Sequence, residues 1–459
     1  MRKAGFVSII FLLFICFICG TTDPVPKSQY IPPSTQRNGN AKDGYQYLVT
    51  GDYLKSGLPY GYFKILNGKD KHNYLQREGK NATVPPGFNV VTAPNGTTVV
   101  VPTCLQCHAQ MLNDSLIVGL GNTELDFSHF DKQHPFLQKL ANRIMQTFSP
   151  KQYQATLPIY RSLTTISPLM KTEVRGVNAA DRLAILLVAH RDPETLEWND
   201  QPILSIPEEV IPTDVPAWWM LKKKNAMFYN GFGRGDFSRF LMLSNLLTVK
   251  DTTEAREVYA HFADVLAYIK TIQSPKYPLP VDPVLATAGE SLFIKNCSHC
   301  HGTYGKEPTF PNLLIPATVI QTDSLLFQAN YQNPQFIDWF NKSWFAKGNM
   351  PARLEPYNGY IAPPLDGIWA TAPYLHNGSV PDLEAVLNSK KRPEYWKRNF
   401  QSQAYDTKNM ACDYKVVNHP EEKGIYNTKK RGYSNAGHYF GDKLTDTERK
   451  ALLEYLKTL

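Results

Sequence analysis

Two short stretches of the sequence, PTCLQCHA at residues 102–109 and NCSHCHGT at residues 296–303, share one spacing of cysteine and histidine. Both contain a C-x-x-C-H motif, formed by Cys104, Cys107 and His108 in the first stretch and by Cys297, Cys300 and His301 in the second. In an exported protein this motif is typical of c-type haem attachment, in which both thiols bond to the haem and the histidine ligates the iron. The repeat therefore predicts two covalently bound haem c groups, with His108 and His301 as iron ligands.

Other uses of paired cysteines fit the sequence less well. A structural zinc site needs two further ligands at similarly close spacing, and a thioredoxin-like motif has no use for the following histidine. The chain has seven cysteines: four in the motifs, Cys16 and Cys19 near the N-terminus, and Cys412. A secreted protein stapled by disulfides would distribute its cysteines along the chain. Cys412 is therefore expected to be a buried or unreactive thiol.

The first twenty residues have the pattern of an export signal. MRK supplies a basic start, and AGFVSIIFLLFICFICG is an apolar stretch too short to favour a retained membrane span. We expect a signal peptide over residues 1–20, with Gly20 at the cleavage site; the alternative is a lipoprotein signal in which Cys19 is acylated. Both predict a periplasmic or secreted protein, attached to a membrane only through such a lipid anchor.

The chain is moderately basic, with a formal net charge of +8. Its densest basic run is Lys222, Lys223 and Lys224, next to the apolar segment PAWWM. No zinc finger, recognition helix or RNA-binding signature accompanies these lysines, so no nucleic-acid partner is predicted. The run is interpreted as a solvated face. The functional alternatives are docking of an acidic redox protein and neutralisation of cofactor carboxylates.

The sequence divides into two regions, one around each motif. Residues 21–45 are rich in Pro, Gly and polar residues and predict an extended leader. Residues 46–275 predict an N-terminal haem c domain, and residues 284–459 predict a C-terminal cytochrome c domain. NVVTAPNGTTVVVP, residues 89–102, predicts a hairpin leading into Cys104, and TTEAREVYAHFADVLAYIKTIQ, ATAGESLFIKN and LTDTERKALLEYLKTL predict amphipathic helices. The expected fold class is mainly α: two c-type cytochrome lobes, with short β-hairpin elements in the N-terminal half.

The group opposite each proximal histidine decides function. A second strong ligand favours electron transfer, whereas an open position permits peroxide or dioxygen chemistry. The candidate sixth ligands for the second haem are Met350, His376, Met410, His419 and His438. For the first haem, His129 and His134 follow the motif closely enough to act as a distal ligand or acid–base group, but a surface position is expected for each. We expect the first iron to be open or to hold an exchangeable ligand.

A longer set of segments carries a family resemblance. The set consists of YIAPPLDGIWATAPYLHNGSVPDLEAVL at residues 360–387, followed by KKRPEYW and GYSNAGHYFG. It resembles the C-terminal lobe of the bacterial dihaem cytochrome c peroxidase superfamily. It is most similar to the dihaem rubber oxygenase branch, the secreted enzymes that cleave polyisoprene with dioxygen. The resemblance covers residues 284–459 well, and the N-terminal half mainly through its haem site and VPAWW.

The resemblance implies roles for particular residues. The C-terminal haem would be ligated by His301 and by His438 of the N-x-G-H segment, with Met350 as the alternative to His438. The N-terminal haem, on His108, would be the reactive one. Trp218 and Trp219 resemble the tryptophan that stands between the two haems and would relay an electron; a buried aromatic anchor is the other interpretation. Phe232 or Phe237 would line a haem pocket.

These observations predict an exported dihaem redox enzyme, peroxidase-like or dioxygenase-like. The N-terminal haem would bind peroxide or dioxygen, with His108, Trp218 and Trp219 as the catalytic residues. The C-terminal haem would relay or store electrons exchanged with a small redox protein as donor or acceptor. The alternative is a non-enzymatic dihaem electron-transfer cytochrome in which both irons are six-coordinate. Resemblance to a branch does not carry substrate identity, so cleavage of polyisoprene is not inferred.

Overall fold

The computed structural model describes residues 27–129, 135–402 and 404–459. The predicted signal peptide over residues 1–20 lies outside the described residues, and so does His134. No helix in the described part of the chain is long and apolar enough to span a lipid bilayer.

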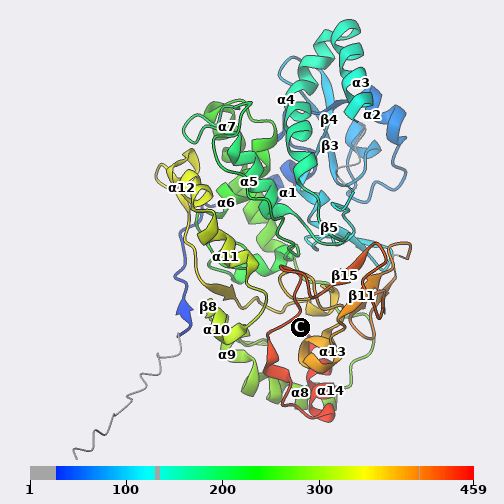
Figure 1. Ribbon diagram of the computed structural model, residues 1–459, viewed down its shortest axis with the longest axis vertical. Coiled ribbons are helices and arrows are strands. Elements are labelled where there is room, and N and C mark those ends of the chain that lie inside the picture. Colours follow the sequence, from blue (N-terminus) through cyan, green and yellow to red (C-terminus); the bar gives the residue numbers. More distant parts are fainter. Residues whose placement is uncertain (1–26, 130–134, 403) are drawn as a thin grey trace, which may run out of the picture.

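Helices and short strands alternate along the described chain. The α-helices are α1 (Ala41–Thr50), α2 (Tyr60–Asn67), α3 (Pro135–Phe148), α4 (Pro150–Ile166), α5 (Ala180–Ala189), α6 (Phe237–Leu241), α7 (Thr252–Thr271), α8 (Pro283–Asn296), α9 (Ser298–His301), α10 (Ala317–Ile320), α11 (Leu325–Gln332), α12 (Pro334–Lys342), α13 (Leu383–Leu387) and α14 (Asp446–Leu456). The strands are β1 (Gln29–Tyr30), β2 (Leu58–Pro59), β3 (Phe88–Thr92), β4 (Thr98–Pro102), β5 (Ala109–Leu112), β6 (Ser115–Val118), β7 (Gly233–Gly235), β8 (Leu313–Pro316), β9 (Ala352–Leu354), β10 (Gly359–Ile361), β11 (Tyr395–Arg398), β12 (Tyr405–Asp406), β13 (Ala411–Cys412), β14 (Tyr414–Val416) and β15 (Ile425–Asn427). Figure 1 shows α3 and α4 at one end of the long axis, and α8 and α14 at the other.

Local sequence signals account for several of these elements. The predicted hairpin is confirmed: β3 pairs with β4, and Gly96 in the turn has a φ of 79°, which glycine adopts without strain. The hairpin leads into Cys104, as predicted. The predicted helices α7, α8 and α14 are also confirmed. The Asp251 carboxylate caps α7, and a capping box between Thr445 and Glu448 starts α14.

The expected fold class, mainly α with hairpins confined to the N-terminal half, is wrong. The described residues are 40% helical and 14% strand, and they form six small sheets, several of them in the C-terminal half. Most strands are two to four residues long, which is too short for an alternating apolar pattern to be recognised. Pairing with distant segments stabilises them: β8, for example, pairs with both β1 and β10.

The two motif-bearing regions are also not separate lobes. β7 from the N-terminal half pairs with β9 from the C-terminal half, and one hydrophobic core contains residues of both halves. In that core the Phe240 and Phe340 rings stack with their centroids 5.3 Å apart. Trp339 Nε1 donates a hydrogen bond to the Arg191 carbonyl at 2.7 Å. The halves therefore share a core, and the predicted domain boundaries stay predictions.

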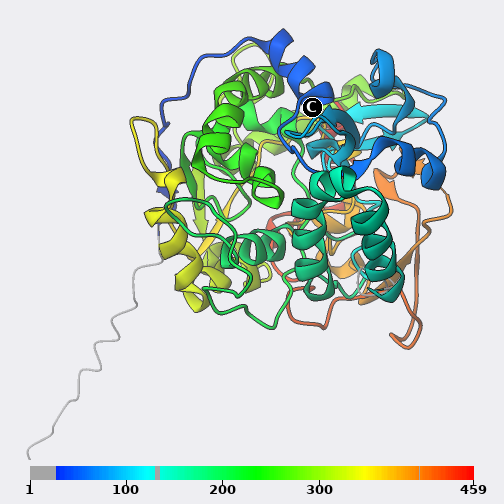
Figure 2. The same ribbon diagram turned by 90° about the horizontal axis from the view of Figure 1, so that it is seen from above.

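Figure 2 shows α3 and α4 side by side, next to the strands of the β2-β4-β3 sheet.

Close helix packing orients the second motif. The helix α8 packs on α14 so closely that a Cβ at Gly289 would lie 2.0 Å from the Ala451 carbonyl oxygen. One turn further along α8, the Phe293 and Tyr455 rings are 5.3 Å apart between centroids. Because α8 ends beside Cys297, this contact sets the direction in which the motif leaves the helix.

Replacing Gly289 with alanine is expected to push α8 away from α14. The free energy of unfolding should fall by about 1–3 kcal/mol, the usual cost of overpacking. Gly61→Ala in α2 is the matched control because no atom lies within 4 Å of the added methyl group, and helix propensity predicts a gain of up to about 1 kcal/mol there. Chemical denaturation followed by circular dichroism measures both variants, and equal stabilities would contradict the packing argument.

Candidate functional site

Both motifs line one cavity of about 930 Å³. Most of its wall consists of aliphatic and aromatic side chains from both halves of the chain. A largely apolar cavity of this size, with a few polar groups, is typical of a cofactor site. The motif residues in its wall are Cys104, Cys107, His108, Cys297, Cys300 and His301.

A tight turn forms the first motif where β4 ends. The Thr103 hydroxyl accepts the N–H of Leu105 at 3.3 Å and caps a 3-10 helix over Cys104–Gln106. The N–H of His108 then donates to the Cys104 carbonyl at 3.0 Å. Leu105 is buried and anchors the turn, so that the two thiols and the imidazole face the cavity together.

The His108 ring lies flat against Trp218. The two ring centroids are 4.5 Å apart, and the planes are inclined by 20°. Gly119 holds the pair: its N–H donates to the His108 carbonyl and its carbonyl accepts from Trp218, both at 2.8 Å. Burial lowers the pKa of His108 to about 3, and its Nδ1 has no hydrogen-bonding partner among the described residues. A neutral, buried imidazole of this kind suits iron ligation.

The thiols of the first motif are free and partly buried. Burial raises the pKa of Cys104 to about 11 and also raises the pKa of Cys107. The Asn178 side-chain amide lies 3.6 Å from the Cys107 sulfur. Two free thiols and a neutral imidazole on an apolar cavity are the donor set that haem c requires. The residues present therefore fit haem c, which would be held by Cys104, Cys107 and His108.

The second motif lies where α8 ends and the single turn of α9 begins. His301 Nδ1 is 2.8 Å from the Pro363 carbonyl oxygen. A carbonyl oxygen only accepts hydrogen bonds, so Nδ1 carries the proton and Nε2 keeps its lone pair for a metal. Burial lowers the pKa of His301, which keeps the ring neutral. Cys297 and Cys300 are free as well, so this motif also fits haem c.

His438 faces His301 with the spacing of a two-histidine iron site. The ring centroids are 6.2 Å apart, and the planes are inclined by 60°. Imidazoles on opposite sides of one metal have ring centres roughly 6 Å apart, because each metal–nitrogen bond is about 2 Å and each nitrogen is about 1 Å from its ring centre. Burial lowers the pKa of His438 to about 4, so both rings are neutral, as ligands must be.

Arg392 holds the loop that carries His438. The guanidinium donates to the carbonyls of Asn435 and Gly437, each at 2.6 Å, and to the His438 carbonyl at 3.3 Å. Its Nε donates to the Ala385 carbonyl in α13 at 2.9 Å. His438 itself has a φ of 51°, a conformation that needs such support. No local signal in KKRPEYW reveals this role, because the accepting carbonyls belong to distant residues.

The other predicted ligands of the second haem lie apart from the His301–His438 pair. Among the described residues, Met350 and His419 do not line the cavity. Met410 is buried in a hydrophobic cluster. His376 does line the cavity, but its Nε2 is 3.0 Å from the Tyr360 hydroxyl, and its ring stacks on the tyrosine with centroids 4.2 Å apart.

The residues predicted near the first haem lie in different parts of the structure. His129 is exposed and lies 3.0 Å from the Asp126 carboxylate, and it is not among the described residues that line the cavity. Phe232 lines the cavity, whereas Phe237 packs in the hydrophobic core. Among the described residues, the ring in contact with His108 is that of Trp218, whereas His301 has the ring of His438 near it.

Trp219 connects the surroundings of the two motifs. It is fully buried, and its Nε1 donates to the Asp366 carbonyl at 2.7 Å. Asp366 follows Pro363, the hydrogen-bonding partner of His301, by three residues. A short path therefore leads from the His108–Trp218 stack through Trp219 to His301.

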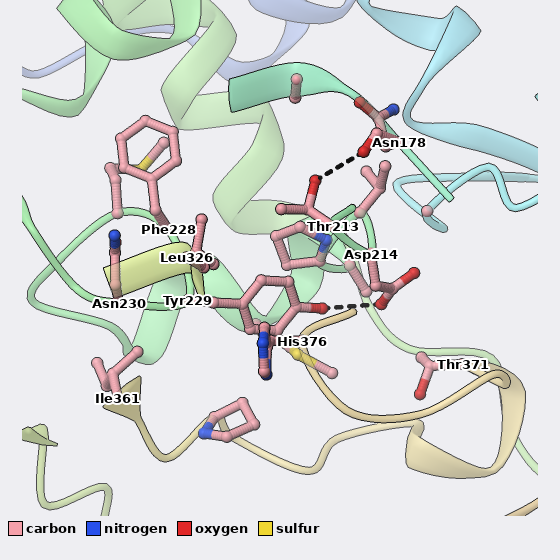
Figure 3. A pocket seen from close by; sticks show the side chains of 18 of the residues that line it. Asn178, Thr213, Asp214, Phe228, Tyr229, Asn230, Leu326, Ile361, Thr371 and His376 are labelled. Atoms are coloured by element: carbon pink, nitrogen blue, oxygen red, sulfur yellow. Dashed lines mark hydrogen bonds between the residues drawn. The ribbon is translucent and has the colours of Figure 1, made fainter. Parts of the chain in front are cut away.

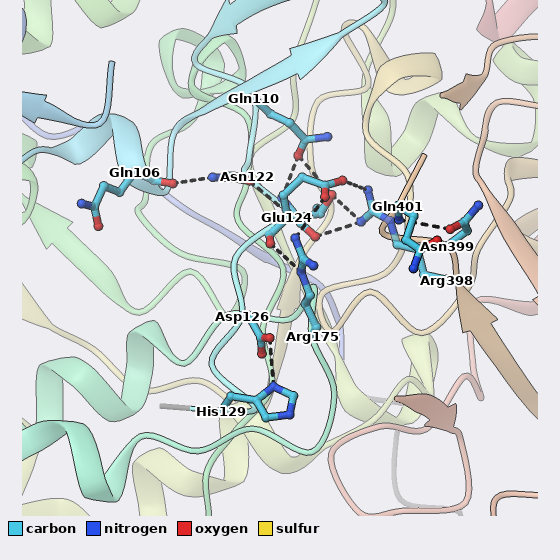
Figure 4. Close-up of polar contacts among 11 residues, drawn as sticks. Gln106, Gln110, Asn122, Glu124, Asp126, His129, Arg175, Arg398, Asn399 and Gln401 are labelled. Carbon is cyan, nitrogen blue, oxygen red and sulfur yellow. Dashed lines mark hydrogen bonds and ion pairs between the residues drawn. The ribbon is translucent and has the colours of Figure 1, made fainter. Parts of the chain in front are cut away.

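A polar network ties the loop after the first motif to the C-terminal half (Figure 4). Arg398 in β11 donates to the Glu124 carboxylate at 2.6 Å and to the Thr123 carbonyl at 2.9 Å. Arg175 donates to the Glu124 carbonyl at 2.9 Å. Gln110 accepts the N–H of Thr123 at 2.7 Å, and both of these residues line the cavity. The network thus fixes one edge of the cavity to β11.

A partly buried carboxyl group also lines the cavity (Figure 3). The Tyr229 hydroxyl donates to the Asp214 carboxylate at 2.8 Å, and the Asp214 N–H donates to the His376 carbonyl at 2.7 Å. Burial raises the pKa of Asp214 to about 7. A group whose pKa lies near the working pH is suited to proton transfer. Sequence reasoning missed Asp214 because a lone aspartate in IPTDVP carries no local signal.

Replacing His438 with alanine should open one side of the second iron site. We expect the visible and paramagnetic-resonance spectra to lose a low-spin component and gain a high-spin one, because His301 would remain as the only strong protein ligand. Met350→Leu is the control and should leave the low-spin component unchanged, since Met350 lies away from the cavity. A spectral change with Met350→Leu and none with His438→Ala would reverse the ligand assignment.

Comparison with known proteins gives two kinds of match. Residues 359–397 match a family described as RoxA-like, cytochrome c-like. Uncharacterized protein y4iM of Sinorhizobium fredii (strain NBRC 101917 / NGR234) is 28% identical in an alignment of 290 residues that covers 55% of this chain and 66% of that protein. Uncharacterized protein y4iJ of the same strain is 38% identical in an alignment of 123 residues that covers 24% of this chain and 20% of that protein. This chain thus spans less than two thirds of each of these relatives.

The family match covers the region that organises the second motif. It begins at β10 and ends in β11, and it includes Pro363, His376 and Arg392. The predicted place in the dihaem peroxidase superfamily, and in its rubber oxygenase branch, stays a prediction. The chain contains a RoxA-like cytochrome c region, which indicates a c-type cytochrome that binds haem c.

Proposed function

We propose that this chain is an exported dihaem c-type cytochrome that acts as a redox enzyme. The haem on His108 would be the site of reaction with peroxide or dioxygen, and the haem on His301 would relay or store electrons. A haem iron with one open face supplies the binding and reduction of such oxidants, whereas an iron between two histidines exchanges electrons. The residues around each haem would decide which of these two roles its iron takes.

The observation that carries this proposal is the difference between the two histidine sites. His301 has a second neutral imidazole at ligating distance, 6.2 Å between ring centroids. The ring in contact with His108 among the described residues is that of Trp218, not that of a histidine. One site would thus hold a saturated iron, and the other would leave a position for an oxidant. Asp214, with its pKa raised to about 7 by burial, would exchange protons there.

Trp218 and Trp219 would carry electrons between the sites. Trp218 stacks on the His108 ring, and Trp219 donates to the Asp366 carbonyl near His301. The two tryptophans are adjacent in the chain and buried, and together with the hydrogen bond of Trp219 to the Asp366 carbonyl they would form a short path. Electrons would reach this path from a small redox protein, outside the cytoplasm, in keeping with the export signal expected over residues 1–20.

The number of haems can be tested by removing each thiol pair. We expect wild-type protein to carry two covalent haems, and the double variants Cys104→Ala/Cys107→Ala and Cys297→Ala/Cys300→Ala to carry one each, because each pair forms the bonds to one haem. Haem staining after denaturing electrophoresis, with intact mass, measures the number. Cys412→Ala is the control and should keep both haems. A pair whose removal leaves the haem content unchanged would not be an attachment site.

The enzyme proposal is tested by exposing the oxidised protein to cyanide. We expect a high-spin component that converts on cyanide binding and a low-spin component that does not respond. His108→Ala should abolish turnover with peroxide and with dioxygen and leave the low-spin component of the second haem intact. If the wild-type protein instead shows two low-spin components that ignore cyanide, both before and after partial reduction, the electron-carrier alternative replaces the enzyme.

A further inference from the structure

The basic run Lys222–Lys224 divides into three environments in the structure. Lys222 donates to the segment that follows α7, and Lys223 forms an ion pair with Asp366 at 2.7 Å. Lys224 lines the cavity, where its Nζ donates to the Phe228 carbonyl at 3.2 Å. Of these three lysines, only Lys224 lines the cavity.

The Lys224 ammonium lacks a counter-charge. None of the ion pairs among the described residues includes it, and the charge that acts on it most is Arg234, which has the same sign. Burial, with that repulsion added, lowers the pKa of Lys224 to about 8, so the group remains mostly protonated at neutral pH. A partly buried cation without a counter-charge is unfavourable. The cavity therefore favours an anion next to Lys224.

Asn230 supplies a second unused donor in the same wall. Its side chain is fully buried and lines the cavity, and its Nδ2 has no hydrogen-bonding partner among the described residues. Figure 3 shows Asn230 next to Phe228, whose carbonyl accepts from Lys224. Buried amide groups are normally hydrogen-bonded, so this donor also indicates an acceptor that the protein itself does not provide.

The loop that carries Asn230 contacts the segment that positions His301. The Tyr229 carbonyl, between Phe228 and Asn230, accepts the N–H of Ile361 at 2.9 Å. Ile361 is followed closely by Pro363, whose carbonyl accepts from His301. The loop with Asn230 therefore runs beside the segment that positions the second proximal histidine.

We propose that Lys224 and Asn230 form a carboxylate-binding subsite in the cavity, next to the second motif. An ammonium and an amide N–H can satisfy one carboxylate, and the ammonium also neutralises its charge. The carboxylate has two possible sources: a propionate of the haem held by Cys297, Cys300 and His301, or the carboxylate of a small organic substrate. The inference rests on the proposed function, because both sources presuppose a haem in the cavity.

The test compares reduction potentials of the low-spin haem in purified holoprotein. If a propionate occupies the subsite, Lys224→Met should lower the equilibrium constant for reduction about tenfold, or about 59 mV for one electron, because loss of the cation disfavours the added electron. Asn230→Ala should lower the potential by a smaller amount. This variant removes no charge, so a shift in its potential would come from the lost hydrogen bond and not from long-range electrostatics. Lys222→Met removes the same charge two positions away and should leave the potential unchanged.

A benzoate titration of the wild-type and Lys224→Met proteins tests the second source. If a free carboxylate occupies the subsite, the potentials stay equal, and benzoate perturbs the visible spectrum of the wild type but not of Lys224→Met. The subsite is overturned if neither the potentials nor the benzoate response distinguishes Lys224→Met and Asn230→Ala from wild type, or if Lys222→Met shifts the potential as much as Lys224→Met. Failure of the proposed function would appear separately, as the absence of a low-spin haem from the wild-type protein.

Discussion

Backbone carbonyls of residues 363–366 hold the two motif-bearing regions in one arrangement. The Pro363 carbonyl accepts from His301, and the Asp366 carbonyl accepts from Trp219, the neighbour of the ring that stacks on His108. Buried polar groups are normally hydrogen-bonded, so neither ring can turn without leaving an unpaired donor. The cavity between the motifs and the distances across it depend on this short segment.

Burial sets the chemistry of that cavity. It lowers the pKa of His108 and His438 and thereby keeps both rings neutral and able to ligate a metal. It raises the pKa of Asp214 to about 7, because a carboxylate is as poorly solvated there as an imidazolium. The same desolvation leaves Lys224 in need of an anion. A largely apolar wall thus gives each of its few polar groups a defined protonation state, and with it a distinct role.

The elements that could be predicted are those whose signals are local. The β3–β4 hairpin follows from a glycine in its turn, and α14 follows from a capping box and a periodic apolar face. The fold class could not be predicted, because most strands are too short to show a pattern, and β1 or β7 becomes a strand only by pairing with β8 or β9. The shared core around Phe240 and Phe340 likewise has no sequence signature, since it forms between segments far apart in the chain.

In the candidate site, too, some residues can be predicted from local sequence signals and others cannot. The C-x-x-C-H spacing identifies Cys104, Cys107 and His108, and their repeats, from sequence alone, because one turn of chain brings three side chains together whatever surrounds it. The residues alone left five candidates for the group opposite His301, and a family resemblance was needed to prefer His438. Its approach to His301 comes from the Arg392 hydrogen bonds and from the fold. The three adjacent lysines could not be told apart from sequence either, because their neighbours in the chain are nearly the same. In the fold, Lys224 lines the cavity, whereas Lys222 and Lys223 bind other segments. Covalent spacing acts over a few residues and can be read directly, whereas burial and long-range contacts exist only once the whole chain has folded.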